Sequence, residues 1–143
     1  MIRQLAHLNF LTNNLPGIID FYVDRLGMKI QFTLNNSQGT PFGYYFGCGN
    51  KTFLEFFEQH LAQEEWGGML DALTAGTRYG HFCLEVTGLT EFVEELRRKE
   101  VEVTEITVGM DNSHQAWITD PDGNRIELME YTSASLQLSG QRT

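Results

Sequence analysis

Two segments of the chain carry apolar residues at the spacing of one face of an α-helix. In the first segment the apolar positions follow the i, i+3, i+4, i+7 pattern at Leu15, Ile18, Ile19 and Tyr22. In the second segment the same pattern falls on Leu89, Phe92, Val93 and Leu96. This period places the apolar side chains on one stripe, so both segments are predicted to be amphipathic helices.

The residues at the ends of these segments indicate where the helices begin and end. Asn14 is the expected N-cap of the first helix, with Pro16 near its first turn and Gly27 just past its end. Thr90 is the expected cap of the second helix.

The two helices belong to a repeat that spans the chain. An offset of 74 residues carries His7 onto His81, and an offset of 72 carries "FLEFFE" (53–58) onto "RIELME" (125–130). A strand and a turn precede each closing strand, in "YYFGCGN" and "QAWITDPDGN". Each half is therefore predicted to contain a strand, a helix and about three further strands.

The repeat divides the chain into two modules with a connection and a tail. The intervening segment is rich in glycine and polar residues, with a short helix expected around Met69 to Leu73. The last residues are small and polar and are expected to fray. The predicted boundaries are a first module at 1–58, a linker at 59–78, a second module at 79–131 and a flexible tail at 132–143.

Composition narrows the class of protein. A chain of 143 residues with 41% hydrophobic residues is large enough for one domain with a core of its own. The net charge of -9 argues against a nucleic-acid partner, which needs clustered Lys and Arg. Two cysteines without a scaffold spacing, no signal-peptide pattern and no membrane-spanning apolar run favour a cytoplasmic protein.

Four side chains hold equivalent places in the two halves. His7 and His81 lie on the opening strands, and Glu55 and Glu127 lie between apolar neighbours on the closing strands. An unpaired buried carboxylate would become neutral, and a dication removes that cost. If the modules pack about a pseudo-twofold axis, the four side chains converge, and this nitrogen and oxygen set suits Zn, Ni, Co, Fe or Mn.

Other polar residues near these strands receive more ordinary interpretations. Glu58 and Glu130 lie three residues beyond the candidate ligands and are expected to face solvent. Cys83 shares the strand parity of His81 and could touch the site, but it is expected to be a small buried hydrophobic side chain. Gln115 and Trp117 are candidate substrate-binding residues, with a surface amide and a packing role as the alternatives; Tyr79 has the same alternatives as Trp117.

The motifs of both halves resemble those of the vicinal oxygen chelate superfamily, and within it the glyoxalase I class. "DFYVDRLGMKI" is similar to the family's first helix and next strand, "YGHFCLEV" to the opening of its second half, and "TDPDGNRIELME" to its closing hairpin. The resemblance extends from His7 to about Glu130. It implies an α+β fold of two βαβββ modules.

The resemblance also implies a site and a reaction. In the family a His, Glu, His, Glu set binds the metal, and these positions match His7, Glu55, His81 and Glu127. Members of this length form homodimers with sites between subunits, and they isomerise a small carbonyl compound through an enediolate while a carboxylate moves the proton. Glu127 is the expected base, with Glu55 as its counterpart on the other side of the substrate.

Three features differ from the pattern of the enzymes that use glutathione. Leu11 stands where an Arg is usual, Gln59 stands where an Asn is usual, and "VEVTEITVGMDNSHQ" is acidic where basic residues hold glutathione carboxylates. The sequence leaves the thiol of the substrate open, as it does the identity of the metal.

Three other functions remain as alternatives. A CoA-thioester epimerase of the same superfamily typically has Gln in place of Glu55. An extradiol dioxygenase needs two His and one carboxylate around Fe(II), so a second carboxylate disfavours it. An antibiotic-binding protein of this fold needs no metal ligands at all.

Overall fold

The computed structural model describes residues 5–67 and 81–139. The chain divides into two compact units, Met1–Ala75 and Gly76–Thr143. The short helix expected around Met69 to Leu73 lies outside the described residues, as does Tyr79. Within the described residues, no helix has the length and apolar character needed to cross a membrane.

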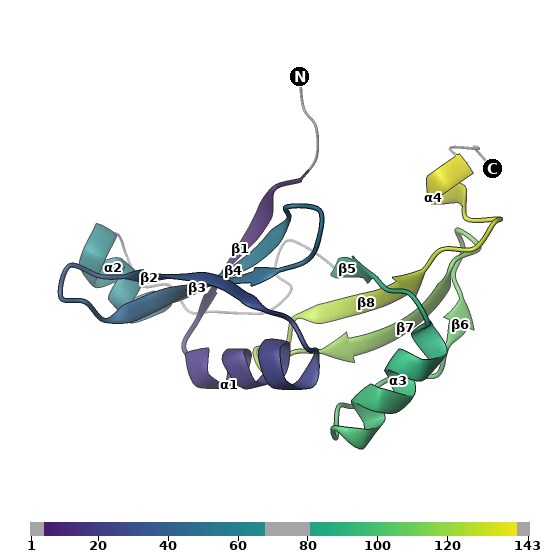
Figure 1. The fold of residues 1–143 in the computed structure, drawn as a ribbon, viewed down its shortest axis with the longest axis horizontal. Helices are drawn as coiled ribbons and strands as arrows, with labels where there is room; N and C mark the ends of the chain where they lie inside the picture. Colours follow the sequence, from purple (N-terminus) through teal and green to yellow (C-terminus); the bar gives the residue numbers. More distant parts are fainter. Residues whose placement is uncertain (1–4, 68–80, 140–143) are drawn as a thin grey trace. The chain divides into compact units, whose positions relative to one another are not determined.

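The first unit is a four-stranded sheet with a helix between its first two strands (Figure 1). Its strands have the order β1-β4-β3-β2, with β1 parallel to β4 and the other pairs antiparallel. The elements are β1 (His7–Thr12), α1 (Leu15–Ile19), the π-helical continuation η1 (Asp20–Arg25), β2 (Ile30–Asn35), β3 (Pro41–Gly47), β4 (Phe53–Glu58) and α2 (Gln59–Trp66).

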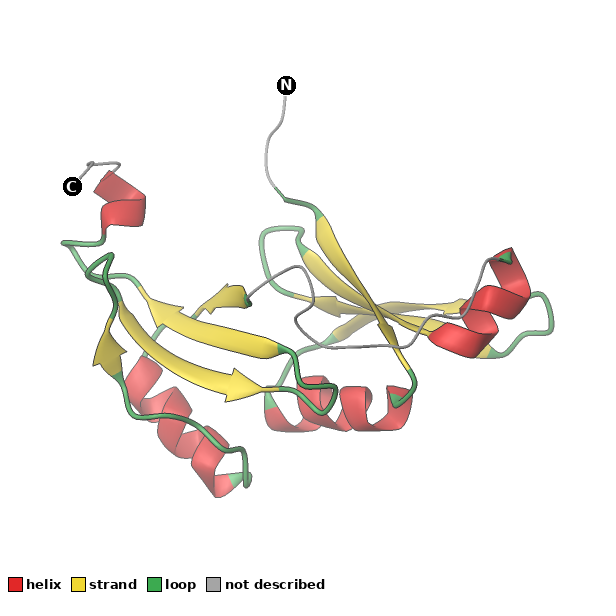
Figure 2. Ribbon diagram, turned by 180° about the vertical axis from the view of Figure 1, so that it is seen from behind, coloured by secondary structure: helices red, strands yellow, loops and turns green. Residues whose placement is uncertain are grey.

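The second unit repeats this plan (Figure 2). Its strands have the order β5-β8-β7-β6, again with the first pair parallel and the others antiparallel. The elements are β5 (Phe82–Glu85), α3 (Leu89–Arg98), β6 (Thr107–Val108), β7 (His114–Thr119), β8 (Arg125–Glu130) and α4 (Leu136–Ser139). The predicted α+β fold of two βαβββ modules is confirmed.

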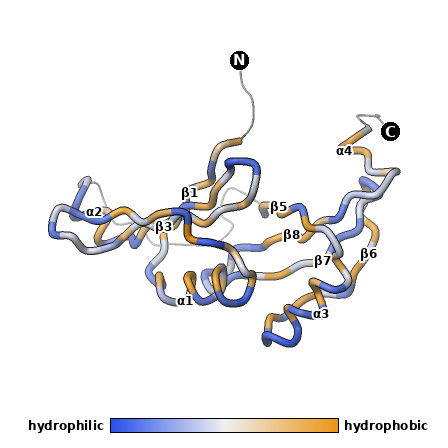
Figure 3. Tube along the Cα trace, in the orientation of Figure 1, coloured by the Kyte–Doolittle hydropathy of each residue, from blue (hydrophilic) through white to orange (hydrophobic). Residues whose placement is uncertain are grey.

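Both predicted helices bury the apolar stripe that defines them. In the first unit Ile18 and Tyr22 are fully buried, and the Tyr22 ring lies 5.0 Å from that of Phe56 in β4. In α3 the buried residues are Leu89, Val93 and Leu96. Figure 3 shows the resulting alternation of hydrophobic and hydrophilic positions along α3.

The helix caps match the prediction at one helix and differ at the other. The Asn14 side chain accepts a hydrogen bond from the Gly17 amide at 3.2 Å, as expected for an N-cap. The prediction of Thr90 as a cap is wrong, because α3 begins at Leu89 after a left-handed Gly88. The Glu130 carboxylate instead accepts from the Gly88 and Leu89 amides, at 2.6 and 3.4 Å.

The predicted linker and the predicted tail each contain a helix in the part that the structure describes. The linker begins with α2, whose Leu61 amide donates to the Glu58 carboxylate at 2.7 Å and whose Ala62 packs on Phe42 and Phe57. Glu58 and Glu130 are thus half-buried helix caps, and the prediction that they face solvent is wrong.

The tail is likewise ordered as far as α4. Ser135 is buried, and its hydroxyl lies 2.8 Å from that of Ser113. The expectation that the chain frays from residue 132 is therefore wrong for the part of the tail that the structure describes. Hydroxyl pairing of this kind leaves no hydrophobic pattern in the sequence.

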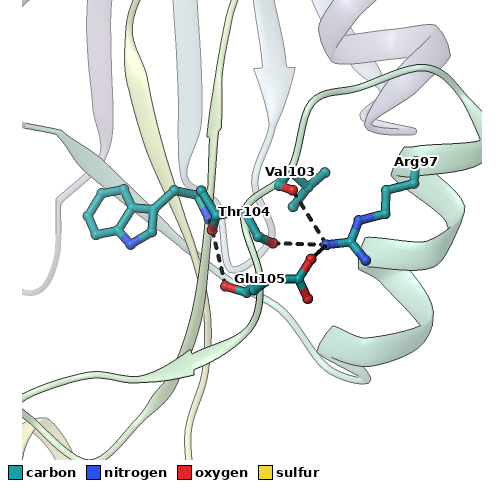
Figure 4. Close-up of polar contacts among 5 residues, drawn as sticks. Arg97, Val103, Thr104 and Glu105 are labelled. Atoms are coloured by element: carbon teal, nitrogen blue, oxygen red, sulfur yellow. Dashed lines mark hydrogen bonds and ion pairs between the residues drawn. The ribbon is translucent and has the colours of Figure 1, made fainter.

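A polar cluster fixes the connection between α3 and β6 (Figure 4). The Arg97 guanidinium donates to the Val103 and Thr104 carbonyls and pairs with the Glu105 carboxylate at 2.8 Å. The Thr104 hydroxyl in turn accepts from the Trp117 amide at 2.9 Å. This cluster fixes the backbone of β7 at Trp117, one of the two residues that the sequence predicts to bind substrate.

Candidate metal centre

The first unit brings His7 and Glu55 together on one face of its sheet. Asn9 pairs with Glu55 in the parallel register of β1 and β4, and His7 lies two residues earlier on the same face. The His7 Nε2 atom lies 3.2 Å from Glu55 Oε1. The Glu55 side chain is 7% exposed and the imidazole 52%, so a mostly buried carboxylate meets a ring that solvent reaches.

Two further polar side chains contact the Glu55 carboxylate. Asn9 Nδ2 donates to Glu55 Oε2 at 3.0 Å. Tyr45 lies opposite Glu55 in β3, and burial raises the pKa of its hydroxyl, with a further rise from the hydrogen bond to Glu55 and from its charge. The sequence analysis missed both residues, although Asn9 shares the strand parity of His7.

The second unit repeats the His and Glu pair. His81 Nε2 lies 3.2 Å from Glu127 Oε2, with the Glu127 side chain 14% exposed. Trp117 lies opposite Glu127 in β7, and its ring contacts the His81 ring edge-on, with 4.7 Å between centroids. The Arg125 guanidinium lies over the same indole, 4.6 Å from the ring centroid.

Cys83 takes the place in the second unit that Asn9 takes in the first. It pairs with Glu127 in the register of β5 and β8 and is exposed, so the prediction of a buried side chain is wrong. Partial burial of the sulfur, the nearby Glu127 charge and the hydrogen bond to Glu127 raise the pKa of the thiol to about 12. Cys83 is therefore a neutral thiol that donates to the carboxylate at neutral pH.

The separation of the paired donor atoms fits two adjacent ligands of one cation. Metal to nitrogen and oxygen distances of about 2.0–2.2 Å put neighbouring ligand atoms roughly 3 Å apart. Both His and Glu pairs have this separation, at 3.2 Å. Across residues 5–67 and 81–139 there is no group of three or more His, Cys, Asp or Glu side chains that could hold a metal. Each unit therefore offers half of the predicted ligand set.

The predicted substrate-binding residues lie beside the second pair. Trp117 faces Glu127, and Gln115 faces Met129 two residues further along β8, so both share the face of Glu127. Both side chains are half-buried. Their role in substrate binding stays a prediction.

The three departures from the glutathione pattern have different surroundings. Leu11 shares the face of His7 and Asn9 and is 43% exposed, whereas Gln59 is buried at the start of α2. In the acidic segment, Glu105 is paired with Arg97 and Asp111 accepts hydrogen bonds from Ser113. Part of that acidic charge therefore serves the fold of the second unit.

Comparison with known proteins decides the family. Residues 4–128 match the family model of the Glyoxalase/Bleomycin resistance protein/Dioxygenase superfamily. The chain belongs to this superfamily. The resemblance found in the sequence is thereby confirmed, and with it the fold that it implies.

Curated relatives in this superfamily include enzymes named lactoylglutathione lyase. That of Escherichia coli O157:H7 is 31% identical over 133 residues, which are 92% of this chain and 95% of the relative. That of Haemophilus influenzae is 29% identical and covers 91% of this chain and 94% of its own length. These relatives support a glyoxalase-type enzyme that acts on a small molecule.

Solved structures show the same fold. A lactoylglutathione lyase from Agrobacterium tumefaciens has a TM-score of 0.64 at 22% identity, covering 89% of this chain and 92% of the other. TnmS3, an antibiotic binding protein from Streptomyces, has a TM-score of 0.67 at 18% identity, covering 92% and 98%. Because both an enzyme and a binding protein share the fold, function depends on the side chains at the site.

Proposed function

We propose that this chain is a metal-dependent isomerase or lyase of the glyoxalase I class. The observation that carries the proposal is the repeated pair of His Nε2 and Glu carboxylate oxygen, 3.2 Å apart in each unit. A binding protein without metal has no need of a buried and a half-buried carboxylate, each beside an imidazole. An epimerase of this superfamily is disfavoured by Glu55.

His7, Glu55, His81 and Glu127 would hold one divalent cation. A bound divalent ion would act as a Lewis acid that stabilises negative charge developing on the substrate oxygens. The two carboxylates favour a doubly charged ion, and the two imidazoles favour Ni, Zn, Co, Fe or Mn over Mg and Ca. The exposed side of each imidazole leaves room for a substrate to approach.

Glu127 would serve as the base that takes a proton from one substrate carbon and returns it to the next. Its side chain is more exposed than that of Glu55, at 14% against 7%. Trp117 beside it gives an apolar wall, and Gln115 gives an amide that can donate to a substrate oxygen. Proton transfer by a positioned carboxylate contributes roughly 10²- to 10⁴-fold to such a rate.

The substrate would be an α-hydroxycarbonyl compound or a hemithioacetal. The names of the curated relatives favour a glutathione hemithioacetal. Leu11, which is exposed beside the His7 pair, offers no charge to a glutathione carboxylate. Whether the substrate contains glutathione or another thiol is decided by the assay of thioester formation described below.

The active molecule would be a homodimer, as the resemblance to family members of this length implies. In this arrangement the first unit of one subunit meets the second unit of its partner. The proposal places two equivalent sites in each dimer.

The test is an assay of thioester formation from methylglyoxal. Protein loaded with Ni²⁺, Co²⁺ or Zn²⁺ is mixed with methylglyoxal and glutathione, and in parallel with cysteine or coenzyme A as the thiol. We expect turnover at ordinary enzyme rates with at least one thiol, loss of turnover after chelation, and recovery on addition of metal. Tight metal-independent binding of an aromatic antibiotic with no turnover would contradict the proposal.

A further inference from the structure

The two candidate carboxylates are equivalent by repeat but have different neighbours. Asn9 and Cys83 occupy the same place, each paired with the carboxylate across a parallel strand. Tyr45 and Trp117 likewise face Glu55 and Glu127 from the antiparallel strand. The repeat thus provides an internal comparison in which only the neighbouring side chains change.

Glu55 has a partner on each oxygen. Oε1 lies 3.2 Å from the His7 imidazole, and Oε2 accepts from the Asn9 amide at 3.0 Å. Tyr45 lies directly opposite Glu55 in the antiparallel register of β3 and β4. A carboxylate held on both oxygens keeps its orientation with little freedom to rotate.

The side chain beside Glu127 is a weaker hydrogen-bond donor than the amide beside Glu55. His81 Nε2 lies 3.2 Å from Glu127 Oε2, and Cys83 lies directly beside Glu127 in the parallel register of β5 and β8. A thiol is a weak donor compared with an amide or a hydroxyl. Trp117, which replaces the tyrosine hydroxyl of the first unit, directs its ring to the edge of His81.

We infer that Asn9, with Tyr45, is a positioning residue that fixes Glu55 as a permanent metal ligand, and that Cys83 leaves Glu127 free to move for proton transfer. The inference rests on the proposed function. It explains why Glu55 and Glu127, which hold equivalent positions in the repeat, would take different roles. None of Asn9, Tyr45 and Cys83 contacts substrate, because each acts through a carboxylate.

The first experiment compares metal affinity. Asn9→Leu keeps the approximate size of the side chain and removes its donor, and Asn13→Leu makes the same change at an exposed asparagine outside the site. Co²⁺ affinity is measured by competition with a chelator, and the visible spectrum of the bound Co²⁺ reports the ligand geometry. Loss of such a partner typically lowers metal affinity about 10- to 100-fold, which we expect for Asn9→Leu with an altered spectrum. Affinity and spectrum equal to those of the Asn13→Leu control would overturn the role of Asn9.

The second experiment gives Glu127 the same kind of neighbour that Glu55 has. Cys83→Asn places an amide beside Glu127, so that both carboxylates are anchored in the same way. We expect kcat to fall about tenfold or more while Co²⁺ affinity is kept or improved, because the base is held in place. An unchanged or higher kcat would overturn the role of Cys83.

A third measurement separates this inference from the proposed function. The side-chain amide signals of Asn9 are followed by NMR in the metal-free protein and in its Glu55→Gln and Glu127→Gln variants. We expect a shift in Glu55→Gln alone, which requires no metal and no substrate. Wild-type protein that fails to bind Co²⁺ refutes the metal site, whereas Asn9 signals unchanged in Glu55→Gln refute the anchoring itself.

Discussion

At the scale of single residues, the decisive feature is a carboxylate with apolar sequence neighbours. Leu54 and Phe56 are buried on either side of Glu55, and Glu55 is itself buried. Burial of a charge is costly unless partners compensate for it, so such a position predicts partners in its surroundings. His7 and Asn9 are those partners in the first unit.

Sequence reasoning selected the four candidate ligands because repetition distinguishes them from many other polar residues. It missed Asn9, and it favoured a buried role for Cys83 over a contact with the site, because both residue types are ordinary in strands. What distinguishes both is the register of a parallel strand pair, in which each lies directly beside a candidate ligand. Register between strands that are distant in sequence is set by the whole fold.

A pH prediction follows from Asp111 in the second unit. Hydrogen bonds from the Ser113 hydroxyl and amide hold the pKa of this carboxyl below its usual value, with a further contribution from Gln137. A lowered folded-state pKa gives stability that is present above about pH 4 and is lost as the pH falls through the folded-state value.

Asp111→Asn should therefore destabilise the protein at pH 7, by less than about 1 kcal/mol because solvent reaches and screens the carboxylate. The difference from wild type should shrink between pH 4 and pH 2, as measured by urea denaturation. Asp24→Asn, at an exposed aspartate of η1, is the control and should show no such trend. A difference that stays constant with pH would contradict the assignment.

At the scale of elements, the helices and strands follow from local periodicity, whereas their ends depend on distant residues. The apolar stripes predicted both helix faces correctly. Thr90 was wrongly predicted as the cap of α3. The carboxylate that accepts from the first amides of the helix belongs to Glu130, 42 residues away from Gly88 in the chain. Local cap patterns cannot identify a carboxylate that arrives from another strand.

Glu130→Ala should weaken α3 and the unit that contains it. The substitution removes a carboxylate that accepts from two amides at the positive end of the helix dipole, which is worth about 1 kcal/mol. The measurement is the free energy of unfolding in denaturant, with Glu94→Ala on the exposed side of α3 as the control. Equal stability of the two variants would show that α3 has no need of this cap.

At the scale of the whole molecule, the two units carry complementary halves of a proposed site. The duplicated plan was predicted from the sequence and is confirmed by the shared strand order of the two sheets. The meeting of the halves across a dimer is a proposal, because it concerns the assembly of subunits. It can be tested by complementation.

His7→Ala and His81→Ala variants should each be inactive, and unfolding and refolding them together should restore activity. Random pairing yields mixed dimers in which one of two sites has all four ligands, which corresponds to about a quarter of wild-type activity. His7→Ala mixed with Glu55→Ala is the control, since both lesions lie in the same half-site and no intact site forms. Absence of recovery in the first mixture would place all four ligands of a site in one chain.

The most direct test of the account is the metal content of the purified protein and of its ligand variants. Elemental analysis should find one divalent ion per chain in the wild type and in His60→Ala, which alters an exposed histidine outside the site. The ion should be lost in His7→Ala and in His81→Ala alike, because each contributes to one shared coordination set. Wild-type protein without a stoichiometric ion, or variants that retain it in full, would contradict the claim that the duplicated halves hold a single cation.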